Sequence, residues 1–268
     1  MSVAAHSLVR SAAALLFCLV VSAFAIPALA GDIPPDQKRS DFFLMSRETQ
    51  AMQEDPTANP GMLWVLDGET LWNQKVGMAR QSCADCHGGT ETSMKGVAAR
   101  YPAFNQAVGR PINLEQRINL CRSERQQATP LAWESKELLA LSAYVGAQSR
   151  GVPIEEKSDE KLKPFIENGR ALFHLRQGQF NLSCSQCHDD NWGKRLAGST
   201  IPQAHPNGYP LYRLEWQSLG SLQRRFRNCF VGVRAEPFVA GAPELIDLEL
   251  YLMSRASGLP IETPAVRP

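Results

Sequence analysis

Apolar residues follow a helical period in one stretch of each half of the chain, over residues 135–147 and 243–254. The apolar positions are Leu138, Leu139, Leu141 to Val145, Leu245, Leu248, Leu252 and Met253. Each of these amphipathic helices is preceded by a shorter helix, and a long irregular segment separates that shorter helix from the elements before it. The pattern predicts an all-α fold built as two tandem units from an internal duplication.

The N-terminus has a different pattern. Arg10 precedes an apolar run at 12–21, and the small residues of 28–30 follow it. This layout is typical of a signal peptide that spans residues 1–30, and the run is shorter than the roughly 20 residues that cross a bilayer. A lipid anchor on Cys18 is the alternative, although further apolar residues follow Cys18 within the run. We therefore expect export to the periplasm and no membrane span.

Length and charge bound the remaining possibilities. The chain has 28 basic and 27 acidic residues, and loss of residues 1–30 removes only one basic residue. The charges nearly balance, so there is no excess of basic residues that would indicate a nucleic-acid partner. The length suits two domains of about 100 residues each. We place them at 31–152 and 153–268, because a charged stretch bounded by prolines, 153–164, reads as the junction.

Two Cys-x-x-Cys-His motifs carry the first chemical signal. They are Cys83, Cys86 and His87 in the first unit, and Cys184, Cys187 and His188 in the second. Two thiols on one helical turn can bond the two vinyl groups of a porphyrin, and the histidine that follows can ligate the iron. A zinc or redox-active Cys-x-x-Cys pair is the alternative, but it does not explain the histidine after each second cysteine. The motifs predict two covalently attached c-type haems.

The two halves also match around these motifs. A glycine-containing helix ending in Leu71-Trp72 corresponds to one ending in Leu172-Phe173, and each leads through a glycine to its motif. After each motif comes a second matched block that ends in a cysteine. Repeated local sequence at a fixed offset indicates duplication.

The sixth ligand of each iron decides the class of cytochrome. Methionine is not matched across the halves, since Met94 and Met253 fall at different positions, and His174 and His205 occur only in the second half. Cysteine is matched: Cys121 ends an Arg-x-x-x-Cys block in the first half. The same block ends at Cys229 in the second.

Two interpretations of these matched cysteines are open. Cys121 and Cys229 can each ligate the iron opposite the motif histidine, or they can form one disulfide between the units. We favour thiolate ligation, because a disulfide gives no reason for a repeated local sequence. The arginines near the second cysteine can pair with haem propionates or bind an anionic substrate. They are Arg213, Arg224, Arg225, Arg227 and Arg234.

The two haem motifs and the matched cysteines, ending in Arg225-Phe-Arg-Asn-Cys229, resemble the SoxA family, the dihaem subunit of the SoxAX cytochrome of sulfur oxidation. The resemblance covers the exported chain. It implies a periplasmic heterodimer with the monohaem cytochrome SoxX that couples thiosulfate oxidatively to a cysteine of the carrier SoxYZ, an L-cysteine S-thiosulfotransferase activity. It also implies His/Cys ligation of both haems, by Cys121 in the first unit.

The resemblance further assigns roles at the second haem. Cys229 is implied to be the catalytic residue, which carries a persulfide, and Arg225 to bind the substrate. The residues alone do not choose Cys229 over Cys121, because both have the Arg-x-x-x-Cys setting. A dihaem electron carrier without chemistry of its own is the main alternative. A dihaem peroxidase is a further one, which a close thiolate on both irons opposes.

Overall fold

The computed structural model describes residues 33–268; the predicted signal peptide, residues 1–30, lies outside them. The first half contains two short 3₁₀ helices, seven α-helices and one β-hairpin. These elements are η1 (Pro35–Gln37), η2 (Asp41–Leu44), α1 (Arg47–Glu54), α2 (Met62–Asn73), α3 (Cys83–His87), α4 (Thr90–Ser93), α5 (Val97–Arg100), β1 (Ala103–Asn105), β2 (Arg110–Ile112), α6 (Leu114–Glu124) and α7 (Lys136–Ala147).

The second half repeats the same order of principal elements. They are η3 (Glu160–Leu162), α8 (Lys163–His174), α9 (Cys184–His188), β3 (Arg195–Leu196), β4 (Ser199–Thr200), β5 (Leu211–Arg213), β6 (Ser218–Gly220), α10 (Leu222–Gly232), α11 (Pro243–Arg255) and β7 (Val266–Arg267). The two predicted amphipathic helices are confirmed as α7 and α11, and the two cysteine-bearing helices as α6 and α10.

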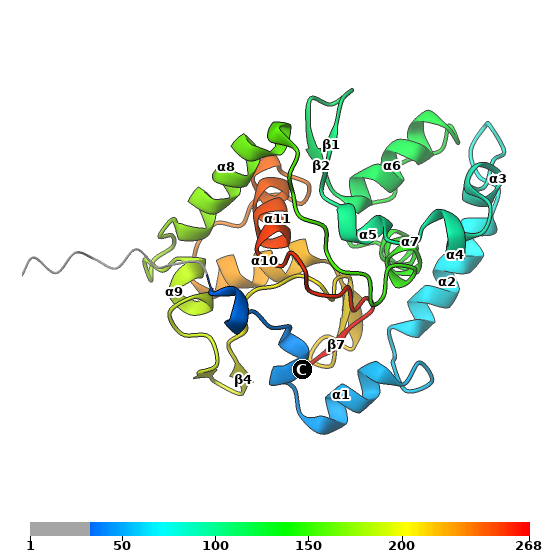
Figure 1. The fold of residues 1–268 in the computed structure, drawn as a ribbon. Helices are drawn as coiled ribbons and strands as arrows, with labels where there is room; N and C mark the ends of the chain where they lie inside the picture. Colours follow the sequence, from blue (N-terminus) through cyan, green and yellow to red (C-terminus); the bar gives the residue numbers. More distant parts are fainter. Residues whose placement is uncertain (1–32) are drawn as a thin grey trace, which may run out of the picture.

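One close helix pair forms the frame of each half. Helix α2 packs along α7, and α8 packs along α11 (Figure 1). The crossings need glycine: a Cβ on Gly68 would overlap the carbonyl oxygen of Ala140, and a Cβ on Gly169 would overlap that of Asp247. Without a side chain at these two positions the helix backbones approach closely, and the flanking apolar side chains are buried around them.

The all-α prediction is wrong in one respect, because the chain also forms small sheets. Strands β1 and β2 pair antiparallel, as do β3 and β4, while β5 lies between antiparallel β6 and parallel β7. Each strand has two or three residues, which is too short for the alternating pattern that identifies strands in a sequence. The dominant architecture is nevertheless helical.

The halves share a core at the three-stranded sheet. Tyr212 of β5 and Leu219 of β6 pack against Val65 of α2 and against Leu139 and Ala143 of α7. Burial of these side chains removes apolar area from water at about 25 cal/mol per Å², so the contact stabilises the two halves as one unit.

The N-terminal segment also crosses between the halves. Arg39 donates from its backbone N–H to Gln203 Oε1 (2.9 Å), and Gln53 Oε1 accepts from the backbone N–H of Val266 (3.0 Å). Residues 35–54 therefore lie against the second half, beside β7 (Figure 1). The predicted division at 152/153 stays a prediction about units, and extensive contacts cross it.

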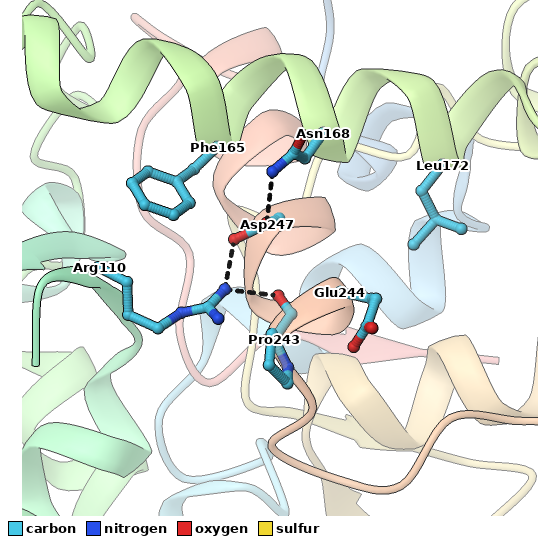
Figure 2. A pocket seen from close by; sticks show the side chains of 7 residues that line it. All are labelled: Arg110, Phe165, Asn168, Leu172, Pro243, Glu244 and Asp247. Carbon is cyan, nitrogen blue, oxygen red and sulfur yellow. Dashed lines mark hydrogen bonds and ion pairs between the residues drawn. The ribbon is translucent and has the colours of Figure 1, made fainter.

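A third contact lies at the β1–β2 hairpin. Arg110 of β2 reaches α11, where it forms an ion pair with Asp247 (2.9 Å) and donates to the carbonyl oxygen of Pro243 (3.2 Å). Asn168 of α8 donates to the other oxygen of the same carboxylate (Figure 2). These residues border a cavity of about 320 Å³. The polar side chains that border the cavity already bond to one another. We therefore interpret this contact as a link between the halves.

Candidate functional site

Both Cys-x-x-Cys-His motifs form one-turn helices, α3 and α9, that begin at a serine. Ser82 Oγ accepts from the backbone N–H of Asp85 (3.0 Å), and the N–H of Ser82 donates to Asp85 Oδ2 (2.8 Å). Ser183 and Gln186 make the same reciprocal pair before the second motif. These caps fix the first turn, so the two thiols and the histidine of each motif lie on a single rigid turn.

The first motif opens into a cavity of about 380 Å³. Cys83, Cys86 and His87 line it, and so does Cys121 of α6. Other apolar and cationic residues complete most of the lining: Trp72, Met94, Val97, Leu114, Ile118, Leu141, Val145, Arg100, Arg117, Arg122 and Arg125. The structure thus brings the predicted attachment residues and the matched cysteine into one chamber.

This chamber fits haem c. Two thiols are available for the vinyl groups, a histidine and a cysteine for the axial positions, apolar walls for the macrocycle and arginines for the propionates. By contrast, no group of three or more His, Cys, Asp or Glu side chains that could hold a bare metal ion occurs in the described part, residues 33–268. A haem iron needs only axial ligands from the protein, because the porphyrin nitrogens fill its equatorial positions.

In the second motif, a hydrogen bond fixes the orientation of the histidine ring. His188 Nδ1 lies 2.7 Å from the carbonyl oxygen of Pro202, which fixes the ring and leaves Nε2 for a metal. Burial lowers the pKa of His188 to about 4, so its imidazole is neutral, the form that binds iron. Phe173 and Tyr251, buried in the core of this half, form part of the surrounding apolar wall.

Cys229 belongs to the second site. Burial raises the pKa of the Cys184 thiol to about 12, and the next largest contribution comes from Cys229. Burial and then Cys229 also raise the pKa of Cys187. The charge of Cys229 thus acts on both motif thiols, which places α10 beside the second motif, where Phe226 and Phe230 of α10 share a core cluster against which Cys184 packs.

All six cysteines between residues 33 and 268 are free. The disulfide interpretation of Cys121 and Cys229 is therefore wrong for this structure. The two sulfurs instead lie in different halves, each in the surroundings of its own Cys-x-x-Cys-His helix.

The arginines one turn before the two cysteines differ in their surroundings. Arg117 is exposed at the first cavity, whereas Arg225 is half-buried beside Cys229. Within the described residues, no hydrogen bond or ion pair occupies the Arg225 guanidinium. Burial acts to lower its pKa, but Cys229, Tyr209 and other negative groups outweigh burial and raise it. A half-buried cation without a protein partner can receive an anion.

Sequence reasoning missed two groups around Cys229 and Arg225. They are Asp41 from η2 and Tyr209 before β5, each coupled electrostatically to Arg225. Arg213 at the end of β5, one of the arginines expected near Cys229, is coupled to Arg225 as well. One signal was available, since Tyr-Pro precedes the hairpin in both halves, as Tyr101-Pro102 and Tyr209-Pro210. Asp41 had no such signal, because only folding brings it across the chain.

A helical frame with two serine-capped Cys-x-x-Cys-His turns, the first of which opens into a largely apolar cavity, defines a c-type cytochrome. The family model "SoxA/TsdA, cytochrome c domain" matches residues 67–154. No helix of residues 33–268 is long and apolar enough to cross a membrane.

Most of the chain aligns with known proteins. It is 40% identical over 235 residues to the L-cysteine S-thiosulfotransferase subunit SoxA of Pseudaminobacter salicylatoxidans, covering 87% of this chain and 82% of that protein. The subunit of the same name from Rhodovulum sulfidophilum is 35% identical over 87% of this chain and 81% of its own length. A chain of the SoxXA crystal structure from P. pantotrophus superposes with a TM-score of 0.82 at 34% identity, covering 85% and 86% of the two chains. The chain belongs to the SoxA family.

Proposed function

We propose that this chain is the SoxA-type subunit of an L-cysteine S-thiosulfotransferase, a cytochrome that couples thiosulfate oxidatively to a cysteine of a carrier protein. The relatives carry the name of this activity, and the chain covers more than four-fifths of the length of the two most similar described above. Cys229 is the catalytic residue and Arg225 the substrate-binding residue.

The reaction is assigned to the second half because of the burial of Arg225 and its lack of an ion-pair partner among the described residues. Arg225 is half-buried one turn from Cys229, and no described residue forms an ion pair with it. Its counterpart Arg117 is exposed. An oxyanion can accept two parallel hydrogen bonds from a guanidinium, and this interaction is strong where water is partly excluded.

The reaction balances as a two-electron oxidation. A carrier thiol and the thiosulfate dianion join through a new S–S bond, and the products are the carrier thiosulfonate, one proton and two electrons. Haem c, when bound, supplies one-electron acceptor chemistry. Arg225 holds the sulfonate oxygens and offsets their charge, while Cys229 presents a sulfur to the incoming thiosulfate. The reaction needs both groups close together, and their position one turn apart on α10 supports this.

Two haems follow from the two motifs. Cys83 and Cys86 attach the first and Cys184 and Cys187 the second. His87 and Cys121 would hold the first iron, and His188 and Cys229 the second. Support comes from the cavity that gathers the first set, the hydrogen bond that orients His188, and the effect of Cys229 on the pKa values of the neighbouring thiols.

Internal duplication explains the matched architecture. Each half has a glycine-crossed helix pair, a serine-capped motif helix, a Tyr-Pro hairpin and a cysteine-bearing helix in the same order. The second glycine of each half supports this origin as well, since Gly77 and Gly178 both adopt positive φ and both abut the loop that follows the cysteine-bearing helix.

The partner assignments follow the family. The crystal structure named SoxXA is a complex, which supports a heterodimer with a SoxX-type monohaem cytochrome. The carrier is SoxYZ and the compartment is the periplasm, where the apolar run at 12–21 would direct the chain.

The test is thiosulfate-dependent reduction of an added cytochrome, with the partner and the carrier present. Cys229→Ala should abolish it, and Cys121→Ala should leave most of the turnover. Near-normal turnover of Cys229→Ala would favour a plain electron carrier instead.

A further inference from the structure

One arginine of the second half has no counterpart in the first. Arg213 ends β5, and the equivalent position of the first hairpin is Asn105 at the end of β1. Asn105 uses its side chain within the hairpin, where its Oδ1 accepts from the backbone N–H groups of Ala107 and Val108. The second hairpin replaces this turn-forming amide with a cation.

The Arg213 side chain is largely enclosed. Only 11% of it is exposed, and its Nε is buried without a hydrogen-bond partner in the described residues. Its one ion pair is with Glu215 (3.3 Å), whose side chain is 65% exposed. An ion pair with so exposed a carboxylate contributes little, about 0–1 kcal/mol, so it does not explain why a guanidinium is buried here.

Trp216 holds the guanidinium in place. The Arg213 Cζ lies 5.3 Å from the centroid of the Trp216 ring, and Arg224 lies 4.2 Å from the same centroid. Stacking restricts the rotamers of Arg213, so less entropy is lost when a ligand binds to it.

Arg213 belongs to the group around Cys229. Burial lowers its pKa, and repulsion by Arg225 is the next contribution, while Tyr209 and Cys229 act in the opposite direction. The geometry agrees, because the Trp216 ring joins Arg213 to Arg224 of α10, the residue before Arg225. Two carboxylates act on Arg225: Glu215, which is exposed, and Asp41, whose Oδ1 is buried and without a partner in the described residues.

We infer that Arg213 is a second anion-binding residue of the Cys229 site, and that with Arg225 it forms a two-arginine clamp for a dianionic sulfur oxyanion. This inference rests on the proposed function. A dianion that loses water on binding beside half-buried side chains needs more than one cation to offset its charge. The clamp also explains why the second hairpin differs from the first: only the site that receives the dianion has the second arginine.

A structural role for Arg213 predicts a different result from a binding role. Loss of a stack and of an exposed ion pair would lower the stability and leave thiosulfate affinity unchanged. Loss of a clamp residue would weaken binding and raise the KM for thiosulfate more than it lowers the stability.

The experiment measures thiosulfate binding to the haem-loaded protein by calorimetry, together with KM and kcat in the coupled assay. Arg213→Gln should weaken binding by roughly ten- to a hundredfold, the range for a lost charge-assisted hydrogen bond. Arg213→Lys retains the charge without the planar fork of the guanidinium. Its affinity for thiosulfate should lie between those of the wild type and Arg213→Gln. Circular dichroism and haem content of both variants establish that they fold.

Arg224→Gln is the matched control. Arg224 stacks on the same Trp216 ring, but it lies 4.0 Å from Glu134 of the first half, and so its charge is partly balanced there. Its substitution should change thiosulfate affinity by less than about twofold. Equal affinities for Arg213→Gln and wild type would overturn the clamp. Failure of the wild type itself to bind thiosulfate would overturn the proposed function instead.

Discussion

Asp189, the residue after His188, forms a buried ion pair with Arg255 of α11, with an N–O separation of 2.5 Å and side chains only 4% and 6% exposed. The Arg255 guanidinium also stacks over Phe173 at 4.6 Å. The end of the second motif helix is thereby tied to the helix pair that frames its half. No such ion pair is needed in the first half, where the Trp72 indole N–H donates to the carbonyl oxygen of Gly88, the residue after His87 (3.1 Å).

Arg255→Gln should therefore destabilise the haem-loaded protein. The change leaves the Asp189 carboxylate buried without its cation, a loss of roughly 3–5 kcal/mol. Urea unfolding gives the free energy. Lys163→Gln, which removes a pair with Glu160 that is exposed on both sides, should cost less than about 1 kcal/mol. Equal losses for the two variants would show that the Arg255 pair is not a buried one in solution.

A second prediction concerns the glycines of the helix crossings. Gly68→Ala and Gly169→Ala place a methyl group against a neighbouring backbone carbonyl, so both should destabilise by several kcal/mol. Gly232→Ala, at the end of α10 where a Cβ meets nothing, should change the stability by no more than about 1 kcal/mol. Thermal unfolding compares the three variants. A tolerated alanine at both crossings would contradict the close helix approach.

The crossings show where sequence reasoning succeeds. Helix α11 was predicted from the spacing of Leu245, Leu248 and Leu252, because a long periodic pattern outweighs local detail. Strand β5 was not predicted, since its three residues are ordered by pairing with β6 and β7 from later in the chain. Its Arg213 could not be assigned a partner for the same reason.

The same contrast applies to the site. Cys229 and Arg225 share one helix, so their proximity follows from the four-residue spacing of their sequence block. Asp41 reaches Arg225 only because the N-terminal segment folds over the second half. Burial of Arg225 and exposure of Arg117 are tertiary properties of identical local motifs.

A pH prediction follows from Glu249 of α11 and Glu115 of α6, two carboxyls of different halves that interact electrostatically. Burial first, and then the charge of Glu115, raises the pKa of Glu249. Asn113 donates to Glu249 Oε2 (3.1 Å), and Lys157 acts on it from the connecting segment. A raised carboxyl pKa adds stability below the unfolded value near 4.5, and this is lost as the pH rises through the folded value.

Glu249→Gln should consequently stabilise the protein at pH 8 and have little effect at pH 4. The glutamine keeps an acceptor for Asn113 and cannot ionise. The expected gain is about 1.4 kcal/mol for each unit by which burial raises the pKa. Urea unfolding across this pH range measures it. A gain that is the same at both ends of the range would contradict the buried carboxyl pair.

Haem stoichiometry and ligation give a fourth prediction. The mass of the intact exported protein should correspond to two covalent haems, and that of Cys184→Ala with Cys187→Ala to one. Cys121→Met should alter the low-temperature EPR signal of one low-spin ferric haem and leave the other, because a thioether replaces one thiolate. An unchanged spectrum would show that Cys121 is not an axial ligand.

On the proposed function, the second half performs the chemistry through Arg225 and Cys229, while the matched first half does not. This division is tested by the mass of the carrier protein after incubation with thiosulfate, the partner cytochrome and an electron acceptor. With wild type and with Arg117→Gln, the carrier should gain one thiosulfate-derived adduct. With Arg225→Gln the rate of adduct formation should fall by roughly tenfold or more, because a charge-assisted contact to the substrate is lost. Equal rates for Arg117→Gln and Arg225→Gln would show that Arg225 does not bind the substrate and that the second half has no special role.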